Sequence, residues 1–158
     1  MQTLKLSELI GKEITDIRFQ YTEENQYGLQ SFHAYLKLND NTIIDIPQSD
    51  EDDYLELTTE NIDYLQKKFD SSESINELAK KYCIGQKIVD FFFFYSDDEF
   101  DIGTSGYIKL SNGYYLSEIN YGPPGITTVD LILLNESKFE NHRNNPKMNI
   151  RSFLNSLQ

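Results

Sequence analysis

Cysteine and histidine are scarce in this chain of 158 residues, and their scarcity argues against several kinds of chemistry. Cys83 is the only cysteine, so an internal disulfide is excluded, and a lone thiol is typical of a reducing compartment. The two histidines, His33 and His142, lie in a predicted strand and in an asparagine-rich loop. No sequence feature brings either one near Cys83 or a marked serine, so a nucleophilic triad lacks its usual base. We expect Cys83 to be a small buried hydrophobic residue at the end of a helix.

Motifs that hold metals or nucleotides are absent as well. The chain has no HExxH, no paired CxxC, no GxxxxGK[ST], no GxGxxG and no EF-hand spacing. We therefore expect no cofactor, no bound metal and no enzymatic activity. One enzymatic alternative stays open, because a glycosidase needs only two carboxylates whose separation in space a sequence does not show.

Basic residues and long hydrophobic runs are also few. Fourteen Lys and Arg stand against 26 Asp and Glu, which gives a net charge of -12. This charge repels phosphate backbones and anionic lipids, so it disfavours a role on nucleic acid or at a membrane surface. No apolar run approaches the length that spans a bilayer, and the first residues lack the features of an export signal. Together with the single cysteine, these features predict a cytoplasmic protein.

The chain does contain an internal duplication. Residues 10–21 (IGKEITDIRFQY) and 84–95 (IGQKIVDFFFFY) are identical at six of twelve positions, where ordinary residue frequencies give roughly one. After a slip of two residues, the match continues between residues 35–38 and 107–110. We predict a single domain, residues 1–158, that contains two copies at residues 7–47 and 81–134.

Hydrophobic periodicity places the secondary structure within this frame. Each copy shows the period of two that predicts strands, and the segment between the copies shows helical spacing. A short helical turn with Ser7 as its N-cap precedes the first strand, and Ser74 and Glu77 form a capping box. The expected strands are 15–21, 32–38, 42–46, 87–95, 106–110, 114–120 and 127–134, and the expected helices are 58–69, 74–82 and 149–157. The predicted fold class is α+β: internally duplicated antiparallel β-meanders of three plus four strands, separated by two helices, with a C-terminal helix.

The two copies differ on the outer face of their first strand. Arg18 and Gln20 of the first copy correspond to Phe92 and Phe94 of the second. We expect the first face to be hydrated. Because large exposed apolar patches are rare, we expect a helix of the same chain to cover Phe92 and Phe94. The alternative is that another chain covers them, as in a subunit of a larger assembly.

Carboxylates are the one abundant reactive group, and they gather in two runs. One run follows the third strand and the other lies at a hairpin tip. The plain interpretation of each run is a solvated loop, but together they form a charged rim that is able to meet a basic surface, with nearby aromatics as anchors. The predicted partner-binding residues are Asp50, Glu51, Asp52, Asp53, Tyr54, Glu56, Asp97, Asp98, Glu99, Phe100, Asp101, Tyr114 and Tyr115.

A strand pair, LSNGYYLSEI, is followed by YGPPGITTVDLILL in this small acidic chain. This pattern, within residues 84–134, resembles the immunity proteins of bacterial polymorphic toxin systems. The resemblance implies an inhibitor that binds one toxin domain, often a basic nuclease, and blocks its active site or substrate groove. It assigns no functional residue. The alternative is a small-molecule or peptide-binding module with a pocket under the Gly-Pro-Pro-Gly loop. The sequence leaves the oligomeric state open.

Overall fold

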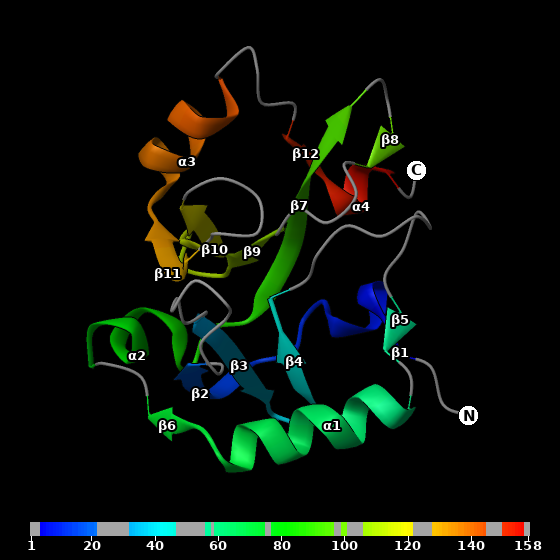
Figure 1. Ribbon diagram of the computed structural model, residues 1–158. Helices are drawn as coiled ribbons and strands as arrows, with labels where there is room; N and C mark the ends of the chain where they lie inside the picture. The colour runs from blue at the N-terminus through cyan, green and yellow to red at the C-terminus, as the bar shows by residue number, and fades with distance from the viewer. Residues whose placement is uncertain are drawn as a thin grey trace.

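The computed structural model describes residues 4–21, 32–46, 56–57, 59–74, 77–96, 99–100, 106–121, 128–144 and 150–156. Two antiparallel sheets, one from each half of the chain, pack against each other, and helices α1 and α3 lie on their outer faces (Figure 1). The arrangement confirms the predicted α+β class, with meanders of three and four strands at the centre of the two sheets.

The first sheet has the strand order β4-β3-β2-β6. Three of these strands form the predicted meander, and the fourth returns from the segment between the copies. A separate two-stranded sheet joins β1 to β5. The elements of the first half are β1 (Leu4–Lys5), the 3₁₀ helix η1 (Leu6–Leu9), β2 (Ile14–Tyr21), β3 (Phe32–Leu38), β4 (Ile43–Asp45), β5 (Glu56–Leu57), α1 (Thr59–Asp70) and β6 (Glu73–Ser74).

The second sheet has the order β11-β10-β9-β7-β12, and β8 pairs with the far end of β7. Four of its strands form the predicted meander. The elements of the second half are α2 (Glu77–Cys83), β7 (Ile88–Ser96), β8 (Glu99–Phe100), β9 (Tyr107–Leu110), β10 (Tyr115–Tyr121), β11 (Thr128–Leu134), α3 (Glu136–Arg143), β12 (Ile150–Ser152) and α4 (Phe153–Ser156).

An internal two-fold relation joins the two copies through backbone hydrogen bonds. The amide of Gly11 donates to the carbonyl of Ile88 (2.7 Å), and the amide of Gly85 donates to the carbonyl of Ile14 (2.8 Å). The two bonds are equivalent under the duplication, because Gly11 and Ile14 of the first copy correspond to Gly85 and Ile88 of the second. Both glycines have positive φ, 89° and 87°, which side chains disfavour. A second reciprocal pair links Ile14 N to Gln86 O and Ile88 N to Lys12 O, each at 2.9 Å.

The correspondence extends to irregularities within the strands. The β2–β3 register shifts between Ile14 and Asp16, and the β7–β9 register shifts between Ile88 and Asp90. At each shift the carboxylate accepts from the next amide, which is that of Ile17 for Asp16 (2.8 Å) and that of Phe91 for Asp90 (2.7 Å). Bulges of this kind bend a strand, so both copies bend at the same place.

The repeat is longer than residues 7–47 and 81–134. In the first half a helix, α1, is followed by β6, which pairs with β2 so that Ser74 faces Arg18. In the second half α3 is followed by β12, which pairs with β7 so that Ser152 faces Phe92. Since Arg18 and Phe92 are equivalent, both copies contain the meander, a helix and a returning strand. The predicted copies, residues 7–47 and 81–134, end before this helix and returning strand.

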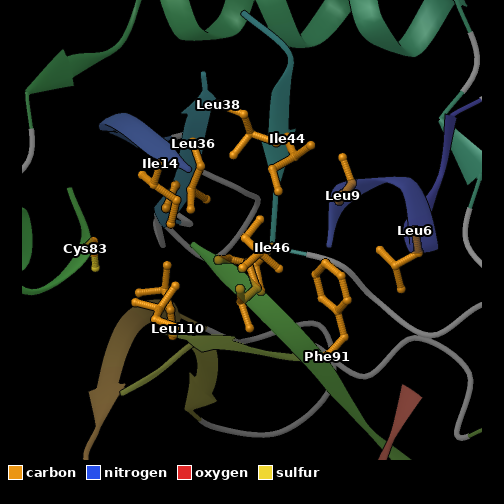
Figure 2. Close-up of a cluster of buried hydrophobic side chains, with 14 of the residues drawn as sticks. Leu6, Leu9, Ile14, Leu36, Leu38, Ile44, Ile46, Cys83, Phe91 and Leu110 are labelled. Carbon is orange, nitrogen blue, oxygen red and sulfur yellow. The ribbon is translucent and has the colours of Figure 1, made fainter. Parts of the chain in front are cut away.

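The main core lies between the two sheets, and Figure 2 shows side chains from both halves converging there. Phe91 and Phe93 point into this core, whereas Phe92 belongs to a second cluster on the outer face of the second sheet. There Phe92 contacts Phe139 of α3, with ring centroids 5.0 Å apart. The prediction that a helix of the same chain covers Phe92 is therefore confirmed. The side chain of Phe94 lies outside the described residues.

The prediction that the outer face of the first strand is hydrated was wrong, because α1 covers this face of the sheet. Leu65 and Phe69 of α1 are buried against Tyr35 and Ile43. Arg18 lies between sheet and helix, with its guanidinium carbon 4.3 Å from the centre of the Phe69 ring, and it donates to the Phe69 carbonyl (3.3 Å). A long side chain with a charged tip can thus fill the position that Phe92 fills in the second copy.

The predicted closing helix, 149–157, was wrong in its first half. Residues 150–152 form β12, in which Ile150 and Ser152 are buried and Arg151 between them is half-buried. This alternation is the period of a strand, and only Phe153–Ser156 are helical. Ser74 likewise belongs to β6, which pairs with β2, and α2 begins at Glu77 and not at the predicted residue 74.

Two further details differ from the sequence prediction. Helix η1 begins at Leu6, so Ser7 lies inside it, and the Lys5 amide donates to Glu8 Oε2 (2.9 Å) at its start. Helix α3 overlaps the predicted loop 141–147. Asn135 caps it, with Oδ1 accepting from the Lys138 amide (2.8 Å), a signal that was readable in the sequence.

Candidate functional site

The acidic residues predicted to meet a partner lie mostly outside the described part of the chain. Residues 50–54, Asp97, Asp98 and Asp101 are outside it, and Glu56, Glu99 and Phe100 are described only as strand residues. Nine of the 26 acidic residues and one of the 14 basic residues fall outside the described ranges. These connecting segments therefore carry -8 of the net charge of -12.

Two short strands hold the ends of these acidic segments. β8 pairs with β7 so that Ser96 faces Glu99, and only Asp97 and Asp98 connect the two strands. β5 pairs with β1 so that Glu56, three residues after the 50–53 run, faces Lys5. In Figure 1 both β5 and β8 lie at the right of the view. Each acidic run is thus close in sequence to a described pair of strands.

Tyr115, which was predicted to contact a partner, is part of the core. Its exposed fraction is 1%, and its ring stacks on Phe139 of α3 with centroids 3.7 Å apart. Its hydroxyl donates to Glu136 Oε2 (3.0 Å). Burial, together with the Glu136 carboxylate, raises the pKa of Tyr115. The residue fastens α3 to the second sheet, and its predicted exposure is corrected.

Tyr114, also predicted to contact a partner, lies half-buried beside Tyr82, the residue before Cys83 in α2. The two rings are 4.6 Å apart at their centroids and tilted by 30°. Asn112 Nδ2 donates to the Tyr82 carbonyl (2.9 Å), which ties the hairpin between β9 and β10 to the end of α2. Burial and the neighbouring Tyr82 hydroxyl raise the pKa of Tyr114.

Exposed and cationic side chains surround this tyrosine pair. Ile84 is 36% exposed, and the Lys81 ammonium lies 5.7 Å from the centre of the Tyr82 ring. Lys87 is exposed just before β7, where it forms an isolated β-bridge with Glu13 and its amide donates to Ser111 Oγ (2.9 Å). We refer to Lys81, Tyr82, Ile84, Lys87, Asn112 and Tyr114 as the tyrosine patch.

Sequence reasoning missed Tyr82, which was read as part of the apolar face of a predicted helix. The signal that could have found it is the duplication itself. Tyr82 aligns with Glu8, and Tyr114 aligns with Thr42. At both positions a tyrosine of the second copy replaces a polar residue of the first. This change indicates a surface that has different roles in the two copies.

The described residues offer little for catalysis. Cys83 is fully buried, and this burial raises the pKa of its thiol to about 12, so the thiolate nucleophile is disfavoured at neutral pH. In the ranges that the structure describes, no three His, Cys, Asp or Glu side chains are grouped so as to hold a metal ion. Within the same ranges, no helix is both long enough and apolar enough to cross a bilayer.

Comparison with known proteins identifies no relative: no family model, no curated protein and no solved structure matches this chain.

Proposed function

We propose that this protein is a non-enzymatic, cytoplasmic binding protein that acts as a bacterial immunity protein and neutralises a basic toxin domain, such as a nuclease. The observation that carries the proposal is the distribution of charge. Segments outside the described ranges carry -8 of the net charge of -12. They connect strands that pair through backbone hydrogen bonds in the duplicated scaffold.

The physical role of these segments is to steer association. Electrostatic complementarity raises the association rate constant from about 10⁵–10⁶ M⁻¹s⁻¹ toward 10⁸–10⁹ M⁻¹s⁻¹ at low salt. Single surface ion pairs contribute only about 0–1 kcal/mol each, so no one carboxylate carries the affinity. Tyr54 and Phe100, which adjoin the two acidic runs, are the proposed anchors, because large aromatic residues dominate interface energetics.

The proposal is tested by charge reversal with a matched control. One variant changes Asp50, Asp52 and Asp53 to Lys. The control changes Asp63, Asp70 and Glu73 to Lys, three exposed acidic residues on and beside α1. Both variants alter the net charge equally, so a difference between them reports position and not total charge.

The measurement is the association rate constant with a toxin captured from the native strain, at low and at physiological salt. We expect the first variant to associate at least tenfold more slowly at low salt, with a weaker salt dependence, and the control to change much less. Recovery of no basic partner, or equal rate constants for the two variants, would contradict the proposal.

A further inference from the structure

The duplication supplies an internal reference for the tyrosine patch. The first copy presents the same backbone positions with other side chains, so it shows what this corner of the fold requires. The equivalent positions, first copy and then second, are Ser7 and Lys81, Glu8 and Tyr82, Ile10 and Ile84, Lys12 and Gln86, Glu13 and Lys87, Asp40 and Asn112, and Thr42 and Tyr114.

The hairpin backbone is the same in both copies, whereas Ser7 and Glu8 lie in the 3₁₀ helix η1 and Lys81 and Tyr82 lie in the α-helix α2. The amide of Thr42 donates to Asp40 Oδ1 (3.1 Å), and the amide of Tyr114 donates to Asn112 Oδ1 (3.2 Å). The amides of Leu38 and Leu110 donate to the carbonyls of Thr42 and Tyr114, each at 2.8 Å. Because threonine satisfies this hairpin in the first copy, the hairpin geometry does not require tyrosine at position 114.

The charge at this corner reverses between the copies. Leaving aside the isoleucine, the six first-copy positions hold three carboxylates and one lysine, and Lys12 forms an ion pair with Asp40. The six second-copy positions hold two lysines and no carboxylate. The first-copy positions thus carry a formal charge of -2, and the equivalent second-copy positions carry +2 on a molecule whose net charge is -12.

The two cations of the tyrosine patch have no anionic partner among the described residues. Lys81 and Lys87 are exposed, and no described carboxylate forms an ion pair with either of them, although Glu13 lies opposite Lys87 in an isolated β-bridge. Beside them, Ile84 is one of the two large hydrophobic residues that are exposed in the described ranges, the other being Tyr64. Ammonium groups without an ion pair, next to half-buried tyrosine rings and an exposed isoleucine, match a ligand that carries both carboxylates and an apolar side chain.

We propose that the tyrosine patch is a second interaction surface, which binds an acidic segment of a partner protein. Carboxylates of that segment pair with Lys81 and Lys87, and an apolar side chain packs against Tyr82, Tyr114 and Ile84. A nucleic-acid ligand is disfavoured, because the protein's net charge of -12 repels a phosphate backbone. This chemistry is opposite to that of the acidic segments, and α2 lies at the left of Figure 1, whereas β5 and β8 lie at the right.

The test imports the first copy's residues into the second. The patch variant combines Lys81→Ser, Tyr82→Glu, Lys87→Glu and Tyr114→Thr, which are the residues at the equivalent positions of the first copy. The matched control combines Tyr64→Thr, Lys67→Ser and Lys68→Glu on α1, where the Lys68 ammonium lies 5.4 Å from the Tyr64 ring centre. This control removes an exposed tyrosine and lysines of similar character from another surface.

The probes are three short synthetic peptides: glutamate with phenylalanine, lysine with phenylalanine, and glutamate alone. Amide chemical shifts of the ¹⁵N-labelled protein are followed during titration. We expect the glutamate–phenylalanine peptide to shift the amides of residues 81–87 and 111–114, with at least tenfold weaker binding to the patch variant and unchanged binding to the control. The glutamate-only peptide should bind more weakly than the mixed one, because it lacks the apolar contact.

Several results would overturn the proposal. They are an absence of shifts at the patch, equal binding of the lysine peptide, or equal loss of binding in the control. Shifts at the patch on addition of an oligonucleotide would assign it to nucleic acid, and salt-sensitive dimerisation that the patch variant abolishes would assign it to a second copy. If the patch variant fails to fold, Lys87→Glu alone must weaken peptide binding. The Asp50, Asp52 and Asp53 variant keeps the patch intact, so the two proposals fail independently.

Discussion

At the scale of single residues, Cys83 shows how burial controls reactivity. Its thiol is fully buried among the side chains of the main core, and this environment raises its pKa from 9.0 to about 12. A raised pKa in the folded state means that the folded protein binds this proton more tightly than the unfolded chain does. The associated stability is present below pH 9.0 and is lost as the pH rises toward about 12.

The prediction for Cys83 follows from this sign. Cys83→Ala should lower the free energy of unfolding at pH 7 by about 1–2 kcal/mol, because it leaves a small cavity. Between pH 9 and 12 the difference between the variant and the wild type should shrink. Urea unfolding at several pH values measures both effects. A native thiol that reacts with a disulfide reagent as fast as the unfolded chain would contradict the burial.

Tyr115 contributes through its ring and through its hydroxyl, and a single change separates them. Tyr115→Phe keeps the stack on Phe139 but removes the bond to Glu136. We expect a loss of about 1–2 kcal/mol of unfolding free energy, since the acceptor is a carboxylate. Phe139→Ala removes the stack and should cost about 3–5 kcal/mol. Equal losses in the two variants, measured by urea unfolding, would show that the hydroxyl carries the interaction.

At the scale of elements, Asp90 fastens the last strand and helix to β7. It accepts from the Ser152 hydroxyl, from the Leu154 amide (3.1 Å) and from the Phe91 amide (2.7 Å). Its equivalent, Asp16, accepts instead from Ile17 and from Arg18 Nε (3.2 Å). The same bulge carboxylate thus anchors a following segment only in the second copy.

This difference gives a paired prediction. Asp90→Asn should lower the unfolding free energy by about 1–2 kcal/mol, because it weakens charge-assisted bonds at the start of α4. It should also speed hydrogen exchange of the Leu154 amide at least tenfold. Asp16→Asn serves as the control and should leave that amide protected. Faster exchange at Leu154 in both variants would indicate a global effect.

At the scale of the whole molecule, the reciprocal bonds at Gly11 and Gly85 join the two halves. A Cβ at either glycine would meet no atom within 4 Å, so its cost would come from backbone conformation alone. With φ of 89° and 87°, Gly11→Ala and Gly85→Ala should each lower the unfolding free energy by about 1–2 kcal/mol. Thermal or urea unfolding should give losses that agree within about 0.5 kcal/mol. A large difference would mean that the two junction strands are not equivalent in energy.

Local patterns were sufficient for much of the fold. Period-two alternation predicted β3 with its observed bounds, and the repeated IG…D…F…Y pattern predicted that the copies share one local structure. These features depend on side-chain alternation and on glycine conformation, which act over a few residues. Helix α3 was missed because Phe139 is its one fully buried apolar residue, so its sequence lacks an apolar stripe.

For the candidate sites, composition alone determined the surplus of negative charge and the scarcity of catalytic groups. It did not determine exposure. Tyr114 and Tyr115 are adjacent and chemically identical, yet Tyr115 lies under α3 and Tyr114 lies beside Tyr82. Successive residues of a strand face opposite sides, and which side is covered depends on a helix that is distant along the chain.

The sequence by itself determined that the chain is duplicated, acidic and built from antiparallel meanders, because these properties are written in residue type and spacing. Only the tertiary structure decided how the copies meet, which aromatic rings are buried and where Lys81 and Lys87 lie relative to the tyrosine pair. Those outcomes arise from contacts between segments far apart in the chain, and neither spacing nor composition records them.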